Sequence, residues 1–153
     1  MHSGRTLTVI RDHHKGPVIG FDSFKGLPET WRPGFEEGHF ATTRIPFINN
    51  AAIVVGLFEE TVPSVLESLT APITLVHFDA DLYSSTAFAL EHVTPYLGER
   101  CMFIFDEYVN YPGWEEHEHL AFREWRNTYP NFITTSVSRV PSHQQATFEI
   151  VRR

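Results

Sequence analysis

The chain has 153 residues, of which 42% are hydrophobic and 14% aromatic, so it is long and apolar enough to bury the core of one globular domain. Twelve Lys and Arg stand against 19 Asp and Glu, for a net charge of -7, which disfavours nucleic-acid binding because a phosphate backbone needs clustered basic side chains. The single cysteine, Cys101, excludes an internal disulfide.

No apolar run approaches the roughly 20 residues of a membrane span. Residues 1–16 lack the apolar core of a signal peptide, and one buried thiol suits a reducing compartment. We therefore expect a soluble, cytoplasmic protein that binds neither nucleic acid nor membrane.

Helical and strand-like patterns alternate along the chain. Apolar residues at helical spacing predict helices at 3–16, 59–70, 84–97 and 113–129. Apolar, often β-branched runs bounded by turn residues predict strands at 17–24, 51–58, 73–79 and 100–108. Residues 131–140 and 145–153 are expected to form a closing β-hairpin.

Helix boundaries also have sequence signals. Ser3 is the expected cap of the first helix and Gly16 its expected end. Ser84 or Ser85 is the expected cap of the helix over 84–97. Residues 25–40 carry many Gly and Pro and are expected to be a loop.

Alternating helices and strands predict an α/β fold with a mostly parallel sheet covered by helices on both faces. We expect one domain over residues 1–153. Sheets of this kind bind ligands at the carboxyl ends of their strands.

Five carboxylates follow the expected strands, and we expect them at one rim of one sheet: Asp22, Asp79, Asp81, Asp106 and Glu107. Like charges this close raise each other's pKa, a cost that a divalent cation would remove. Alternate residues of an extended segment point the same way, so Asp79 and Asp81 could share a face if strand geometry continues to Asp81. Hard oxygen ligands of this kind suit Mg²⁺.

Ordinary explanations remain open for the same residues. The acids could be helix caps or salt-bridge partners in loops. Asp22 could accept hydrogen bonds from a ribose or form an Asx turn before Ser23. His77, inside an apolar strand, is expected to be a core residue with its polar atoms satisfied. Residues 111–114 could be a hydrophobic plug or a substrate wall.

Four segments, in this order and spacing, resemble the macrocin O-methyltransferase (TylF-type) family: residues 20–31, 56–63, 77–86 and 105–125. The resemblance extends from about Ser3 to Val151. Members are class I S-adenosylmethionine-dependent methyltransferases. The resemblance implies a Rossmann-like, mostly parallel sheet with an antiparallel C-terminal hairpin. It also implies Mg²⁺-assisted methyl transfer to a hydroxyl group, often on a sugar of a natural product.

Carried onto this chain, the resemblance implies functional residues. Asp79, Asp106 and Glu107 match the metal ligands, and Asp81 matches the general base. The cofactor-binding positions are Asp22, which matches the ribose-binding acid, its neighbour Ser23, and Gly56, Leu57 and Phe58, which match the wall near the adenine. The implied partner is a small-molecule hydroxyl acceptor, and self-association into a homo-oligomer is plausible for the family.

The chain opens at "MHSGRTL", which resembles the tail of the family's glycine-rich loop. We therefore expect an N-terminally truncated domain, with a gap in its sheet where the family's first strand runs. A non-catalytic binding module is an alternative that this feature favours. Asp-x-Asp after a strand also occurs in phosphatases of the haloacid dehalogenase type and in metal-dependent glycosyltransferases.

Overall fold

The computed structural model describes residues 3–139 and 141–153. Backbone contacts divide the chain into two compact units, Met1–Pro63 and Ser64–Arg153. Within the residues described, no helix is both long enough and apolar enough to cross a bilayer.

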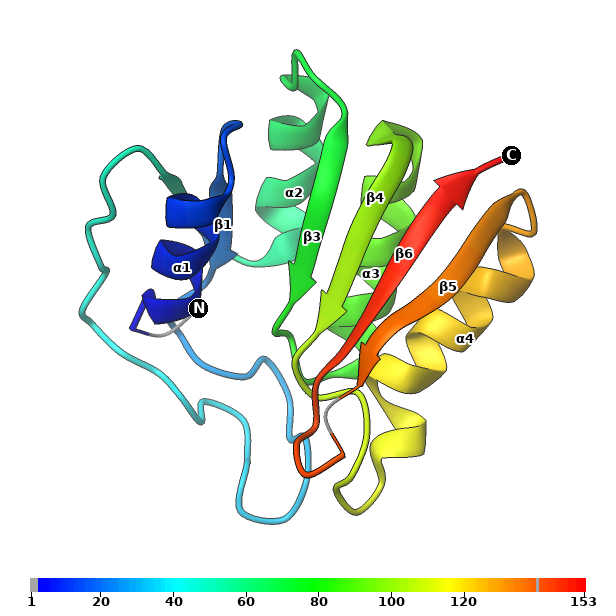
Figure 1. Ribbon diagram of the computed structural model, residues 1–153. Helices are drawn as coiled ribbons and strands as arrows, with labels where there is room; N and C mark the ends of the chain where they lie inside the picture. Colours follow the sequence, from blue (N-terminus) through cyan, green and yellow to red (C-terminus); the bar gives the residue numbers. More distant parts are fainter. Residues whose placement is uncertain (1–2, 140) are drawn as a thin grey trace. The chain divides into compact units, whose positions relative to one another are not determined.

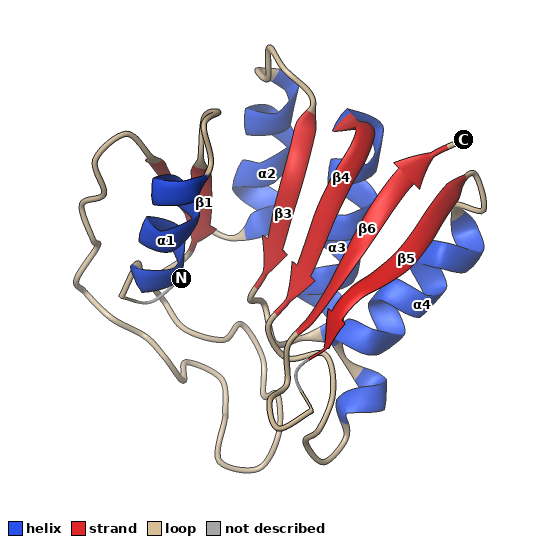
Figure 2. Ribbon diagram, in the orientation of Figure 1, coloured by secondary structure: helices blue, strands red, loops and turns tan. Residues whose placement is uncertain are grey.

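The first unit is built around two short parallel strands. Its elements are α1 (Arg5–His13), β1 (Ile19–Asp22), β2 (Ala52–Val55) and the start of α2 (Phe58–Glu67). The strands pair in register from Ile19 opposite Ala52 to Asp22 opposite Val55. Leu7, Val18 and Ile48 form a small buried cluster, and a long loop joins β1 to β2 (Figure 2).

The second unit is a four-stranded sheet with helices. Its elements are β3 (Ile73–Phe78), α3 (Tyr83–Val93), the 3₁₀ turn η1 (Thr94–Tyr96), β4 (Leu97–Phe105), the 3₁₀ turn η2 (Trp114–Glu116), α4 (Glu118–Thr128), β5 (Phe132–Arg139) and β6 (Ala146–Arg152). The strand order is β3-β4-β6-β5. β3 and β4 are parallel, whereas β6 is antiparallel to both β4 and β5, which confirms the predicted C-terminal hairpin.

An aromatic core holds β3 and β4 against α4 on the face that α3 and α4 cover (Figure 1). Phe103 and Phe105 are alternate residues of β4 and are completely buried, as is Phe122 of α4. Phe78 stacks on Phe105 with ring centroids 4.7 Å apart. Because these rings fix the last residues of both strands, the loops that follow start from a rigid base.

The described strands form two sheets, in line with the gap that the family resemblance implied where the first strand runs. Asp22 ends a strand of the two-stranded sheet, whereas Asp79 and Asp106 follow strands of the four-stranded one. A rim shared by Asp22 with Asp79 and Asp106 stays a prediction. The predicted α/β class, with parallel pairing between β1 and β2 and between β3 and β4, is confirmed.

Three predicted helix boundaries are wrong. The N-cap of α1 is Gly4 at φ 76° instead of Ser3, and the helix ends at His13 instead of Gly16. The N-cap of α3 is Leu82, with no side chain of the described chain capping it, so Ser84 and Ser85 lie inside the helix. Backbone geometry replaces the expected side-chain caps, because glycine adopts positive φ without strain and tertiary packing can fix a helix start that has no polar cap.

Candidate active site

Acidic residues of the second unit come together where β3 and β4 end. The strands are parallel neighbours with Phe78 opposite Phe105, and the Asp106 N–H donates to the Phe78 carbonyl at 2.9 Å. Asp79 is the residue after Phe78, and Asp106 is the residue after Phe105. Both therefore lie at the same edge of the sheet, where the two strands end.

Asp79, Asp106 and Glu107 each offer one carboxylate oxygen, and these three oxygens lie within 4.8 Å of one another. One oxygen of Glu107, Oε2, is buried and has no hydrogen-bond partner in the part of the chain that the structure describes. The structure thus brings the three predicted metal ligands together. Their role as ligands stays a prediction.

Burial and the neighbouring carboxylates both shift the pKa of Glu107. Burial, followed by the nearby carboxylates of Glu118, Asp81, Asp106 and Asp79, raises the pKa of Glu107 to about 10. Five acids around one point favour either a bound proton or a bound cation.

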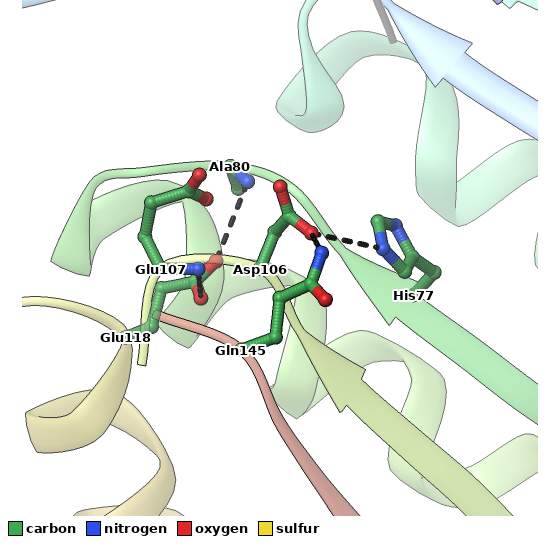
Figure 3. Close-up of polar contacts among 6 residues, drawn as sticks. All are labelled: His77, Ala80, Asp106, Glu107, Glu118 and Gln145. Atoms are coloured by element: carbon green, nitrogen blue, oxygen red, sulfur yellow. Dashed lines mark hydrogen bonds and ion pairs between the residues drawn. The ribbon is translucent and has the colours of Figure 1, made fainter. Parts of the chain in front are cut away.

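Two side chains hold Asp106. His77 Nε2 lies 3.6 Å from Asp106 Oδ1, and the Gln145 amide donates a hydrogen bond to the same oxygen (Figure 3). The contact with His77 is the largest cause that lowers the pKa of Asp106, and Gln145 adds to it against the opposing effect of burial. His77 therefore contacts a site acid, where the sequence predicted a core residue.

Asp81 is 9% exposed and has φ 61°. The backbone at Asp81 is left-handed and β3 already ends at Phe78, so the condition that strand geometry continues to Asp81 is not met. Asp is one of the few residue types besides glycine that tolerate this conformation. Asp81 is close enough to raise the pKa of both Glu107 and Glu118, so it belongs to the same cluster by a turn instead of by strand alternation.

The predicted cofactor residues of the first unit cluster at the carboxyl ends of β1 and β2. The Gly56 N–H donates to the Asp22 carbonyl at 3.2 Å. Asp22 Oδ1 accepts from the Phe24 N–H at 2.8 Å, and Ser23 Oγ accepts from the Lys25 N–H at 3.1 Å. The Asx turn that the sequence left open is therefore present at Asp22.

Gly56 begins the turn from β2 into α2 and has φ 152°. A Cβ atom there would come within 2.6 Å of Thr61 Cγ2, and Thr61 Oγ1 donates to the Leu57 carbonyl at 2.8 Å. Phe58 is the first residue of α2. The close approach explains why glycine occupies this position. Contact of these residues with a cofactor stays a prediction.

The raised pKa of Glu107 predicts a pH dependence of stability. The folded protein keeps this proton up to about pH 10, whereas the ordinary value is 4.5, so the free energy of unfolding should fall as pH rises between these values. One such carboxyl contributes at most about 1.4 kcal/mol per pH unit, or about 3–6 °C in Tm. Thermal denaturation in EDTA between about pH 6 and about pH 9 measures this slope.

Glu107→Gln should reduce the slope, and a part should remain because burial also raises the pKa of Glu118. Glu116→Gln, at an exposed position of η2, is the matched control and should leave the slope unchanged. Equal slopes in the wild type and Glu107→Gln would contradict the assignment of a retained proton to Glu107.

A family model described as a methyltransferase domain matches residues 2–108. The chain belongs to this methyltransferase-domain family. The matched part contains the two parallel strand pairs, β1 with β2 and β3 with β4, and the acids of the cluster up to Glu107. The finer assignment to the TylF-type family stays a prediction. No curated protein matched the chain in sequence.

Solved structures of methyltransferases share the fold. The calicheamicin methyltransferase CalS11, described in its apo form as a TDP-rhamnose 3'-O-methyltransferase, matches with a TM-score of 0.69 and 26% identity, covering 96% of this chain and 64% of CalS11. The O-methyltransferase NovP matches with a TM-score of 0.66 and 18% identity, covering 97% and 64%. TomG from Streptomyces achromogenes, solved with SAM, matches with a TM-score of 0.57 and 16% identity, covering 98% and 79%.

The chain thus spans less than two thirds of the length of CalS11 and NovP. The Rossmann-like methyltransferase fold predicted from the sequence is confirmed by these matches.

Proposed function

We propose that this methyltransferase-family chain transfers a methyl group from S-adenosylmethionine to a hydroxyl group of a small molecule, with a divalent cation, Mg²⁺, at the acidic cluster. The observation that carries the proposal is the convergence of three carboxylate oxygens within 4.8 Å beside a buried Asp81. A sugar hydroxyl is the proposed acceptor, because CalS11 is described as a TDP-rhamnose methyltransferase.

The first unit supplies the proposed cofactor contacts. Asp22 ends β1 and Gly56 follows β2, which is where parallel strands of α/β proteins bind nucleotides. A carboxylate at Asp22 would accept hydrogen bonds from ribose hydroxyls. The chain around Gly56, Leu57 and Phe58 would contact the adenine.

The acidic cluster fits a hard divalent cation. Its donors are all carboxylate oxygens, which Mg²⁺ prefers, and the buried Oε2 of Glu107 lacks a hydrogen-bond partner among the described residues. When bound, the cation would lower the pKa of an acceptor hydroxyl and compensate the charge of the acids. Asp79, Asp106 and Glu107 would hold it.

Asp81 is the proposed general base. A sugar hydroxyl is a weak nucleophile at neutral pH, so its proton must leave as the new bond to carbon forms. A carboxylate at Asp81 would accept that proton. The methyl carbon of a sulfonium donor is already electrophilic, so the remaining contribution of the protein is alignment of the two reactants.

Calorimetry with S-adenosylmethionine and its demethylated product, with and without Mg²⁺, tests the proposal. We expect saturable binding to the wild-type chain and about tenfold or more weaker binding to Asp22→Asn, since a hydrogen bond to a charged group contributes about 1.5–3 kcal/mol. Asp12→Asn, at an exposed position of α1, is the control. Absence of binding under both conditions would contradict the proposal and favour a non-catalytic module.

A further inference from the structure

Glu118 is a buried acid for which the proposed chemistry gives no role. It is the first residue of α4 and is 0% exposed. Its helical neighbours Ala121, Phe122 and Trp125 are apolar and buried. A carboxylate in such surroundings is costly unless several hydrogen bonds satisfy it.

Its two oxygens accept hydrogen bonds from the two loops that carry the acidic cluster (Figure 3). Oε1 accepts from the Ala80 N–H at 3.4 Å. Oε2 accepts from the Glu107 N–H at 3.1 Å. Ala80 lies between Asp79 and Asp81 in the sequence, so one side chain joins the loop after β3 to the loop after β4.

The geometry of this contact suits a carboxyl group. Both partners are backbone N–H donors, and they point at different oxygens of the same side chain. Each oxygen of a carboxyl group has a lone pair that can accept, whereas an amide of the same size must turn its NH₂ group toward one of the two N–H groups. Glutamine would therefore keep one loop contact and lose the other.

We propose that Glu118 is a positioning residue that fixes the spacing between Asp79 on one loop and Asp106 and Glu107 on the other, and so sets the cation affinity of the cluster. This inference rests on the proposed cation site. Glu118 acts through the two loop backbones, while Asp79, Asp106 and Glu107 supply the ligand atoms.

The test is Mn²⁺ binding by Glu118→Gln, followed by electron paramagnetic resonance and calorimetry well below the Tm of the variant. We expect the Mn²⁺ dissociation constant to rise about 10- to 100-fold, the range found when groups that orient metal ligands are changed. The dissociation constant for S-adenosylmethionine measured without metal should stay at the wild-type value. Glu116→Gln, at an exposed position of η2 just before α4, should bind Mn²⁺ as the wild type does.

A Glu118→Gln variant that is less stable but binds Mn²⁺ with wild-type affinity would overturn the positioning role and leave the proposed function intact. A wild-type chain that does not bind Mn²⁺ would instead overturn the cation site, and this inference with it.

A second measurement covers the case in which Glu118→Gln does not fold. Hydrogen exchange of the wild-type chain should show the Ala80 and Glu107 amides exchanging as slowly as strand amides of β4 such as Phe103, because both are bonded to a buried acceptor. Exchange of either amide at the rate of an exposed loop would overturn the proposal.

Discussion

Replacing Asp81 with asparagine should lower kcat for methyl transfer about 100- to 10 000-fold, the usual contribution of a general base, and leave the affinity for S-adenosylmethionine unchanged. The loss follows from the chemistry, since an amide cannot accept the proton of the acceptor hydroxyl. Asparagine is also the substitution that best preserves the backbone, because it tolerates the left-handed conformation that Asp81 adopts at φ 61°.

Single-turnover kinetics with saturating cofactor and acceptor measures this effect without interference from product release. Glu91→Gln, which removes an exposed carboxylate from α3, is the control and should retain wild-type kcat. An Asp81→Asn variant with kcat within a few-fold of wild type would exclude Asp81 as the base.

Replacing Asp106 with asparagine should abolish the proposed activation of methyl transfer by Mg²⁺. The substitution removes one of the three oxygens that lie within 4.8 Å of one another and disturbs the contacts with His77 and Gln145. We expect the Mg²⁺ dissociation constant to rise by more than about 100-fold, beyond the effect of changing a residue that only orients a ligand. Titration of Mg²⁺ by calorimetry and by initial rates gives this constant in two independent ways.

Glu99→Gln removes an exposed carboxylate from β4 and should not alter the Mg²⁺ response, which separates a ligand effect from a change in net charge. Normal Mg²⁺ activation of Asp106→Asn would mean that the cation, if one acts, is bound elsewhere.

The sequence predicted the element order and the convergence of the second-unit acids because both depend on local patterns. Apolar runs mark β3 and β4, and the residue after each is an Asp, so parallel pairing alone brings Asp79 and Asp106 together. The position of Asp81 could not be obtained this way. A left-handed residue after Phe78 ends the strand alternation, and Asp-x-Asp does not encode that turn.

His77 and Glu118 illustrate a signal that was present in the sequence. His77 lies two residues before Asp79, so strand alternation places it on the side toward which Asp79 points. Glu118 precedes Ala121, Phe122 and Trp125 at intervals of three, four and seven, which is the spacing of one helix face. A single acid on such an apolar face indicates a buried carboxyl group that needs hydrogen-bond partners.

The sequence contains no comparable signal for the contact of Gln145 with Asp106. This contact depends on the antiparallel register of β4 and β6, in which Phe105 lies opposite Ala146. The sequence predicts the β5–β6 hairpin but not the register of β6 against β4, because β4 and β6 are far apart in the sequence and no turn joins them.

Anomalous diffraction from crystals soaked in Mn²⁺ tests most directly whether the acids after β3 and β4 bind one cation. We predict a single strong peak within about 2.6 Å of carboxylate oxygens from Asp79, Asp106 and Glu107. A map with no peak at these three side chains, under conditions in which methyl transfer proceeds, would contradict the account.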